Sequence, residues 1–311
     1  MTQPSERALA HPLVIWIVSD GKPGHLNQTR GLADALVRAT AVETHIVPAL
    51  PIWRATLTGL LGRFPALDLP APDLILGAGH ATHLTMLAAR RAHGGRTVVL
   101  MKPSLPRRFF DLVIAPAHDG LKTDARTWAT EGAINRIVPS TTSAQPAQGL
   151  ILIGGPSPHF EWNNDAIQVQ IRSLLARLPE LHWTLATSRR TPPDFLAQLP
   201  RHEALKTVRP ETTTPGWLPA QLAASRIVWV TPDSASMVYE ALTAGADVGV
   251  FDLPVNPKSR VGWAIAGLAD NRRITRFIQW CAHGTLHPNQ TPLSEADRIA
   301  SHLLAWLTPR N

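Results

Sequence analysis

The chain has 311 residues, a single cysteine and a formal net charge of +7. Its length suits two domains of ordinary size, and the single cysteine excludes an intramolecular disulfide and a cysteine-rich metal site. The positive charge favours anionic partners such as nucleotides, phosphorylated lipids or an acidic membrane surface. Because the basic residues are spread along the chain without a long basic run, nucleic acid is not expected as a partner. No apolar run approaches the length of a membrane span, and we expect a cytoplasmic protein.

The first half of the chain alternates apolar strands with helices. Residues 13–18 (LVIWIV) form a short apolar run that predicts a buried strand. A glycine-containing loop follows at 19–25, and we expect a helix over about 26–39 and a strand over about 43–47. This strand–helix–strand order predicts a parallel sheet. The same reasoning places further strands at 73–78, 97–101 and 111–115, and a helix that ends near residue 91.

Residues 51–65 (PIWRATLTGLLGRFP) combine bulky apolar side chains with two arginines, Arg54 and Arg63. Two interpretations fit this composition. The favoured one is a helix packed on its own domain, because basic residues are few. The other is a partly exposed amphipathic helix that touches a membrane surface, which would place the protein peripherally at the inner membrane.

A polar stretch at 139–148 (PSTTSAQPAQ) predicts a linker, and the alternation of strands and helices restarts after it. We expect strands at 150–153, 183–187, 226–230 and 247–251, and helices at 164–178, 194–199, 261–268 and 293–307. The pattern predicts an α/β protein with two Rossmann-like, doubly wound parallel-sheet domains that face a cleft. The predicted domains are 1–140 and 149–292, and residues 293–311 form a C-terminal helix that packs back across the domains.

The segment 231–245 (TPDSASMVYEALTAG) predicts a strand that turns abruptly into a helix. Ser234 is a good N-cap, and the free N–H groups at the helix start attract anions. The small residues Ser234, Ala235 and Ser236 allow a phosphate to approach closely. Glu240 shares a helix face with Ser236, so its carboxylate is placed to hold the vicinal hydroxyls of a sugar. A strand, a turn and a helix with an exposed glutamate fit the segment equally well.

Two further turns in the same half of the chain suit a phosphate. The loop 154–159 (GGPSPH) offers backbone donors and the Ser157 hydroxyl, and the loop 187–192 (TSRRTP) carries two adjacent arginines suited to bidentate phosphate binding. Neither loop is a G-x-G-x-x-G fingerprint, a P-loop or a nucleophile elbow. Three such turns in one domain favour an anion site more strongly than any one of them.

The first loop, DGKPGH, holds Asp20, Lys22 and His25. A histidine or aspartate on such a loop, facing a donor across a cleft, can deprotonate an acceptor hydroxyl. The alternative for His25 is a packing role at the start of the following helix.

Two histidines and a basic loop lie elsewhere in the first half. His80 and His83 are three residues apart, but no carboxylate is near them in the sequence and no third ligand is visible, so we expect no metal site. His80 is assigned to an acceptor pocket. Lys102 opens the basic loop 102–108, which suits an acidic group or a lipid headgroup, although a solvated loop is the default interpretation.

Four motifs resemble a bacterial and plant family that takes its name from the plant "elongated mitochondria" fission factor. They are SDGKPGHLNQTRGLADAL, GGPSPHFEWN, TLATSRRTP and VTPDSASMVYEALTAGADVGVFDLP, and the match runs from about residue 13 to residue 270. The family is similar in architecture to GT-B glycosyltransferases, which have two Rossmann-like domains and bind the donor nucleotide sugar in the C-terminal one. The resemblance places Glu240 where many GT-B enzymes grip the nucleotide ribose. It carries to the donor side Gly155, Ser157, Ser188, Arg189, Ser234, Ser236 and Glu240.

The DGKPGH loop, with Lys22 and Gly24, resembles the glycine-rich acceptor loop of the lipid-linked GlcNAc transferase family but has fewer glycines. The resemblance therefore implies a metal-independent GT-B glycosyltransferase that transfers a hexosyl or related group. The donor is a nucleotide-diphosphate sugar, the acceptor is a glycan or glycolipid of the cell envelope, and no cofactor is needed. His25 or Asp20 would act as the base if the reaction inverts.

Two other functions remain open from the sequence. The first is a nucleotide-sugar epimerase of the same fold, for which Asp20, Asp233 and Asp252 are candidate acid/base carboxylates. The second is a non-catalytic adaptor that recruits a protein or a membrane, because the plant members are associated with recruiting a dynamin-like protein to mitochondria.

Overall fold

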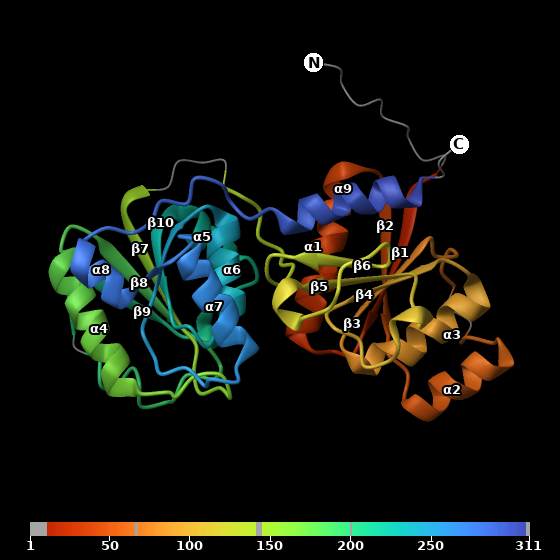
Figure 1. The fold of residues 1–311 in the computed structure, drawn as a ribbon, viewed down its shortest axis with the longest axis horizontal. Coiled ribbons are helices and arrows are strands. Elements are labelled where there is room, and N and C mark those ends of the chain that lie inside the picture. Colours follow the sequence, from red (N-terminus) through yellow and green to blue (C-terminus); the bar gives the residue numbers. More distant parts are fainter. Residues whose placement is uncertain (1–10, 66–67, 141–144, 200, 309–311) are drawn as a thin grey trace, which may run out of the picture. The chain divides into compact units, whose positions relative to one another are not determined.

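The structure is a computed structural model that describes residues 11–65, 68–140, 145–199 and 201–308 (Figure 1). The chain divides into two compact units. The first contains residues 1–136 together with 295–311, and the second contains residues 137–294. The C-terminal helix α9 (Glu295–Leu307) therefore belongs to the first unit.

The first unit contains a six-stranded sheet with the strand order β2-β1-β3-β4-β5-β6, and every neighbouring pair is parallel. The apolar runs of the sequence correctly predicted four of its inner strands and β2. The short strand β6 was missed because only four residues form it. The strands are β1 (Leu13–Ser19), β2 (Val42–Pro48), β3 (Leu74–Ala78), β4 (Arg96–Leu100), β5 (Leu112–Pro116) and β6 (Thr127–Thr130).

Strand β1 is buried on both faces of this sheet, which explains its continuous apolar sequence. Side chains of a strand alternate between the two faces. Leu13, Ile15 and Ile17 accordingly pack into the core under α1 (Pro23–Ala39) and α9. Their neighbours Val14, Trp16 and Val18 pack into the opposite core, which includes residues of α3 (His83–His93). Helix α2 (Ile52–Leu61) lies beside α3 (Figure 1).

The second unit contains another six-stranded sheet, with the order β12-β11-β10-β7-β8-β9 and only parallel neighbours. Its strands are β7 (Gln145–Ile153), β8 (His182–Thr187), β9 (Leu205–Val208), β10 (Ser225–Val230), β11 (Asp247–Val250) and β12 (Thr275–Arg276). Its helices are α4 (Asn164–Arg177), α5 (Trp217–Ala224), α6 (Ala235–Ala244), α7 (Arg260–Asp270) and α8 (Phe277–His283).

Three sequence predictions in this unit were wrong or incomplete. Residues 194–199 form turns instead of the expected helix, in keeping with the marginal stability of very short helices. The predicted linker 139–148 ends earlier than expected, because β7 begins at Gln145; its residues 141–144 lie outside the described ranges. The elements β9, β12, α5 and α8 were not predicted.

Two tryptophans of the second core lie against strand glycines. The buried Trp229 ring covers Gly249 of β11, where a methyl group would lie 2.5 Å from the ring carbons. Trp183 of β8 covers Gly149 of β7 in the same way. Glycine allows this close approach because it has no side chain.

One helix boundary near the predicted loops differs from the prediction. Helix α6 ends as expected at Gly245, which adopts a left-handed conformation with φ of 95°. Ser234 occupies the N-cap position but makes no side-chain capping hydrogen bond. Helix α1 begins at Pro23 instead of residue 26, because proline is favoured in the first turn of a helix. Gly24 and His25 are therefore helical and not part of the preceding loop.

None of the helices within the described ranges combines the length and the apolar character that crossing a bilayer requires.

Candidate functional site

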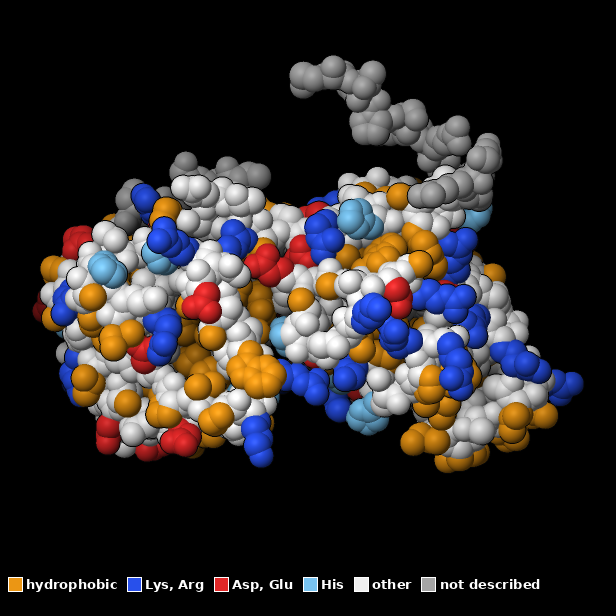
Figure 2. Space-filling view, in the orientation of Figure 1, with side chains coloured by type: hydrophobic (Ala, Val, Ile, Leu, Met, Phe, Trp, Pro, Cys, Tyr) orange, Lys and Arg blue, Asp and Glu red, His pale blue; other side chains and the backbone are white. Residues whose placement is uncertain are grey.

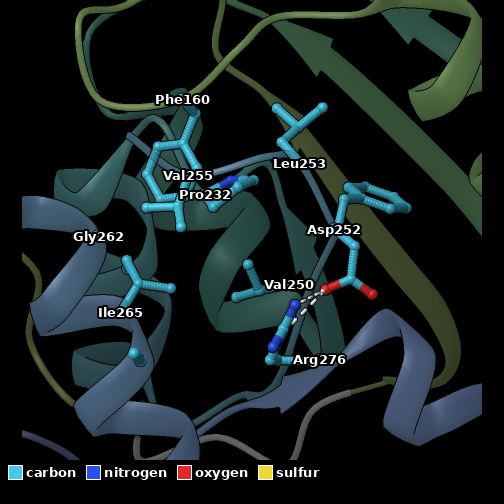
Figure 3. A pocket seen from close by; sticks show the side chains of 11 residues that line it. Phe160, Pro232, Val250, Asp252, Leu253, Val255, Gly262, Ile265 and Arg276 are labelled. Carbon is cyan, nitrogen blue, oxygen red and sulfur yellow. Dashed lines mark hydrogen bonds and ion pairs between the residues drawn. The ribbon is translucent and has the colours of Figure 1, made fainter. Parts of the chain in front are cut away.

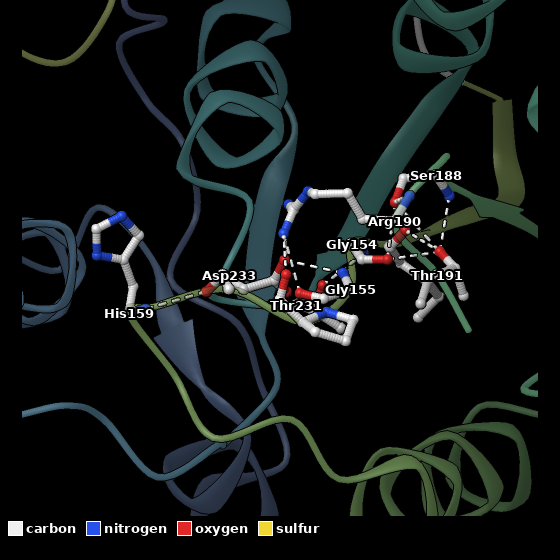
Figure 4. A network of polar contacts seen from close by, with 11 residues as sticks. Gly154, Gly155, His159, Ser188, Arg190, Thr191, Thr231 and Asp233 are labelled. Carbon is white, nitrogen blue, oxygen red and sulfur yellow. Dashed lines mark hydrogen bonds and ion pairs between the residues drawn. The ribbon is translucent and has the colours of Figure 1, made fainter.

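Three loops of the second unit meet at the carboxyl edge of its sheet. They follow β7, β8 and β10, which are neighbours in the order β10-β7-β8. Parallel strands bring their carboxyl ends to one edge, where ligands bind in open α/β sheets. The three phosphate-suited turns predicted from the sequence are therefore brought together (Figure 4).

A buried ion pair joins these loops. The side chain of Asp233 is 1% exposed, and its Oδ2 accepts hydrogen bonds from the Gly155 N–H at 2.9 Å and from Arg190 Nη2 at 2.8 Å. Arg190 Nη1 donates to the carbonyl oxygens of Gly155 and Pro156 at 3.0 and 3.1 Å. Figure 4 shows Arg190 reaching from the β8 loop across the β7 loop to Asp233. The pair fixes the relative positions of the three loops.

The two glycines after β7 are required by this close packing. A methyl group at Gly154 would collide with the Asp233 carboxylate, and one at Gly155 would collide with the Arg190 carbonyl. The Gly154 N–H donates to Thr231 Oγ1 at 2.8 Å. The family resemblance assigned Gly155 to the donor side, but its N–H is directed at Asp233.

Two of the serines assigned to the donor side bond within the unit. Ser188 Oγ donates to the Gly154 carbonyl at 2.8 Å. Ser157 Oγ accepts from the His159 N–H at 3.2 Å, and the His159 ring in turn lies 3.0 Å from Ser259 Oγ at the start of α7. These contacts shape the loops after β7 and β8.

The start of α6 is partly exposed to solvent. Ser234 is buried, Ala235 is half-buried and Ser236 is exposed, while Glu240 is half-buried one turn further along. The first N–H groups of a helix have no carbonyl partner within that helix, and the helix dipole gives this end a partial positive charge. The exposed Arg189 extends the positive surface of the neighbouring loop. This arrangement can bind an anion.

The distinction between the two adjacent arginines was missed from the sequence. The loop pattern indicated both arginines and the resemblance selected Arg189, but Arg190 is the one that contacts Asp233. The local sequence cannot distinguish two adjacent arginines on a loop, because the direction in which each side chain points depends on the tertiary structure.

In the first unit, Asp20 and His25 form a hydrogen-bonded pair. His25 Nδ1 lies 2.9 Å from Asp20 Oδ2 and 3.1 Å from Oδ1. Asp20 Oδ1 also accepts from the Lys22 N–H at 3.2 Å. Burial acts to raise the pKa of Asp20, but the hydrogen bonds from His25 and Lys22 and their positive charges outweigh it, so the pKa falls below its ordinary value of 3.8. Asp20 is thus an ionised partner that orients His25.

Gly79, which follows β3, makes room for the His25 ring. Its φ is +83°, and a methyl group there would collide with that ring. Because β1 and β3 are neighbours in the sheet, the loop after β1 and the turn after β3 are side by side. The sequence signal for this contact is the glycine directly after a buried strand, but nothing local in the sequence relates it to His25.

The two other histidines separate in the structure. His80 is exposed in a short turn, whereas His83 is buried, with its ring 5.1 Å from Phe110 and its Nδ1 3.2 Å from Ser104 Oγ. Burial, assisted by the charge of His80, lowers the pKa of His83 to about 4. Within the described residues, no group of three His, Cys, Asp or Glu side chains is arranged to hold a metal ion. Lys102 is exposed, and its N–H donates to Asp119 at 3.3 Å.

A pocket of about 100 Å³ lies next to the carboxyl end of β11 (Figure 3). Its walls are mostly apolar and include Phe160, Pro232 and Ile265. At its edge Arg276 Nη2 lies 2.8 Å from Asp252 Oδ1, and Asp252 Oδ2 accepts from the Ile278 N–H at 2.7 Å. Both Asp233 and Asp252 are therefore held by arginines, which weakens their assignment as acid/base groups.

The comparisons with known proteins agree with this fold. The model of the family described as "Mitochondrial fission ELM1" matches residues 23–307. The chain belongs to the mitochondrial fission ELM1 family. The uncharacterized protein RP120 of Rickettsia prowazekii (strain Madrid E) is 23% identical over 348 residues, which cover 92% of this chain and 96% of the relative.

Solved structures identify the fold of this ELM1-family member as GT-B. A Listeria monocytogenes protein described as a UDP-N-acetylglucosamine 2-epimerase matches with a TM-score of 0.61 and 13% identity over 95% of each chain. The Neisseria meningitidis UDP-GlcNAc 2-epimerase bound to UDP-GlcNAc matches with a TM-score of 0.54 and 12% identity, over 95% of this chain and 100% of the other. The glycosyltransferase SnogD from Streptomyces nogalater matches with a TM-score of 0.50 and 13% identity, over 96% of this chain and 100% of the other. At these identities the likeness establishes the fold alone.

Proposed function

We propose that this protein is a GT-B-type glycosyltransferase that uses a nucleotide-diphosphate-sugar donor. The observation that carries the proposal is the meeting of three loops at the carboxyl edge of the second sheet, next to the start of α6. The Arg190–Asp233 pair pre-organises these loops, so a ligand need not order them on binding. Two similar solved structures are described as enzymes of UDP-N-acetylglucosamine, one of them bound to UDP-GlcNAc.

In this proposal, the N–H groups of Ala235 and Ser236 bind the diphosphate, and the buried Ser234, whose N–H donates to the Thr231 carbonyl at 3.3 Å, shapes the turn that presents them. The two N–H groups stabilise the negative charge that develops when the bond between the sugar and the diphosphate breaks. Arg189 adds a charge-assisted contact from the exposed side of the β8 loop. The Glu240 carboxylate accepts hydrogen bonds from the ribose hydroxyls.

The first unit supplies the acceptor residues in the same proposal. His25 removes the proton from the acceptor hydroxyl as that oxygen forms a bond to the sugar's anomeric carbon and the nucleoside diphosphate leaves. Asp20 holds Nδ1 of His25, which leaves Nε2 for the proton, and it stabilises the imidazolium that forms. Lys22, Gly24, His80 and Lys102 belong to the acceptor side, and the acceptor is a glycan or glycolipid.

Thermal-shift measurements with UDP, GDP, ADP and CMP and their sugar conjugates test the donor site. A ligand at about 100 times its Kd stabilises the folded state by about 2.7 kcal/mol, so one nucleotide family should raise Tm. Glu240→Gln removes the carboxylate charge and should abolish that shift. The matched control is Glu180→Gln, at an exposed residue before β8, which should preserve it. The absence of a shift with every nucleotide would refute the proposal.

A nucleotide-sugar epimerase is the second candidate, favoured by the two epimerase structures that share the fold. It would need acid/base carboxylates at the donor, whereas Asp233 and Asp252 are paired with Arg190 and Arg276. Turnover of a nucleotide sugar in the absence of any acceptor would favour the epimerase over the transferase.

A further inference from the structure

Helix α2 of the first unit is amphipathic in the reverse sense to a normal surface helix. Its inner face is made of small residues. Ala55 is its one residue that is fully buried, and a methyl group added to Gly59 would lie 3.7 Å from Ala88 Cβ of α3. Its outer face carries side chains that are each 50 to 74% exposed, namely Ile52, Trp53, Leu57, Leu60 and Leu61. We call these five residues the α2 ridge.

Packing within the unit accounts for the inner face but not for the ridge. The small side chains let α2 approach α3 closely, and the Leu50 N–H donates to Thr85 Oγ1 of α3 at 2.9 Å, which anchors the start of the helix. The large apolar side chains are left in water. An exposed contiguous apolar patch of this kind marks an interaction surface.

The charges around the ridge are of one sign. Arg54 and Arg63 are exposed, and residues 49–65 contain no acidic residue. Arg91 of α3 is exposed, with its Nε 3.6 Å from the position of a methyl group on Gly62, at the end of α2. Figure 2 shows the apolar side chains at the lower right, over α2, with basic side chains beside them.

We propose that the α2 ridge docks this protein on the surface of an anionic lipid bilayer. The five apolar side chains enter the boundary between headgroups and acyl chains, and Arg54, Arg63 and Arg91 bind lipid phosphates. Trp53 supplies the type of side chain that is favoured at the membrane–water interface.

The size of the ridge argues against a second copy of the chain as its partner. A ten-residue helix is about 15 Å long and about 10–12 Å wide. Its outer face offers only part of the about 800 Å² per partner that a stable protein–protein interface buries. Docking on a bilayer does not require this minimum buried area, because the insertion of apolar side chains and the attraction between charges act together.

Vesicle flotation of the full chain tests this docking. The wild-type chain should float with vesicles of phosphatidylglycerol and phosphatidylcholine, less with phosphatidylcholine alone, and less as salt is raised. The double variant Trp53→Glu/Leu60→Glu should lower the bound fraction by at least about tenfold. Val169→Glu, at an exposed apolar residue of α4, is the matched control and should float like the wild type.

A second variant separates charge from apolar insertion. Arg54→Glu/Arg63→Glu should weaken flotation with the anionic vesicles and reduce the loss of flotation as salt is raised. Circular dichroism and Tm would verify that both double variants fold. Failure of the wild type to float, or equal flotation of Trp53→Glu/Leu60→Glu, would overturn the proposal. So would light scattering that finds a wild-type dimer that this variant dissociates, because the ridge would then bind a second copy.

Discussion

Arg190 Nη2 lies 2.8 Å from Asp233 Oδ2, and this ion pair connects the loop after β8 to the loop after β10. Asp233 is almost fully buried, whereas the Arg190 side chain is 43% exposed. A buried carboxylate that loses its cation keeps its desolvation cost. The pair is therefore a structural support beneath the candidate donor site.

Arg190→Ala should destabilise the second unit by about 1–3 kcal/mol, because it leaves the buried Asp233 carboxylate without its cation. Chemical denaturation followed by circular dichroism measures the change. Arg189→Ala removes the exposed neighbour and should change stability by less than about 0.5 kcal/mol. The double variant Arg190→Ala/Asp233→Asn should recover part of the loss. Equal effects of the two arginine variants would show that the ion pair has no structural role.

Strands such as β1 and β10 could be predicted because they are buried on both faces and are continuously apolar. The edge strands β9 and β12 could not, since partly exposed residues form them. Helix α2 was predicted as a helix, and exposure of its apolar residues was the less favoured of two interpretations. The sequence pattern could not decide between them, because it does not reveal that Ala55 and Gly59 face inward while larger residues face water. For the site, motifs located the three loops, but only the tertiary structure distinguishes Arg190 from Arg189.

Gly249→Ala should lower the free energy of unfolding by about 1–3 kcal/mol, because the added methyl group would overlap the Trp229 ring. Gly267→Ala is the matched control, since Gly267 is in α7 and nothing lies within 4 Å of its added methyl group. That control should be neutral or stabilising by up to about 1 kcal/mol. Urea denaturation of both variants measures the difference. A neutral Gly249→Ala would contradict the close packing of Trp229.

The pH dependence of stability should include a contribution from His83. Its pKa in the folded protein is lowered from 6.5 to about 4, so the unfolded chain binds a proton at higher pH than the folded one. The contribution is therefore present above pH 6.5 and is lost as the pH falls toward 4. The loss amounts to about 3 kcal/mol.

The variant His83→Phe keeps a ring beside Phe110 and cannot titrate. Between pH 7 and about 4.5 it should lose less stability than the wild type does. Urea denaturation at both pH values measures this difference. Equal losses in the two proteins would exclude His83 as the titrating group.

Asp20 is an acid whereas His83 is a base, but the contribution of Asp20 to stability is also lost as the pH falls. Its pKa in the folded protein is below 3.8, so its stabilising contribution is present above that value and is lost as the pH falls through the lowered pKa. Asp20→Asn should therefore differ in Tm from the wild type at pH 6, and the difference should shrink toward about pH 3. A Tm difference that is the same at both pH values would contradict this assignment.

Ser236→Asp should separate ligand binding from stability. An acidic residue in the first turn of α6 interacts favourably with the helix dipole, so Tm without ligand should stay the same or rise slightly. The same charge repels a diphosphate at that position, so the Tm shift with nucleotides should disappear. Ser236→Ala should keep that shift. An unchanged nucleotide shift in Ser236→Asp would place the anion elsewhere.

The start of α6 is the proposed binding site for the diphosphate of a nucleotide sugar. The most direct test is a crystal structure of the chain with the nucleoside diphosphate that gives the largest thermal shift. The expected result is phosphate oxygens within hydrogen-bonding distance of the N–H groups of Ala235 and Ser236, and ribose hydroxyls on Glu240. A nucleotide bound elsewhere on the chain would contradict it.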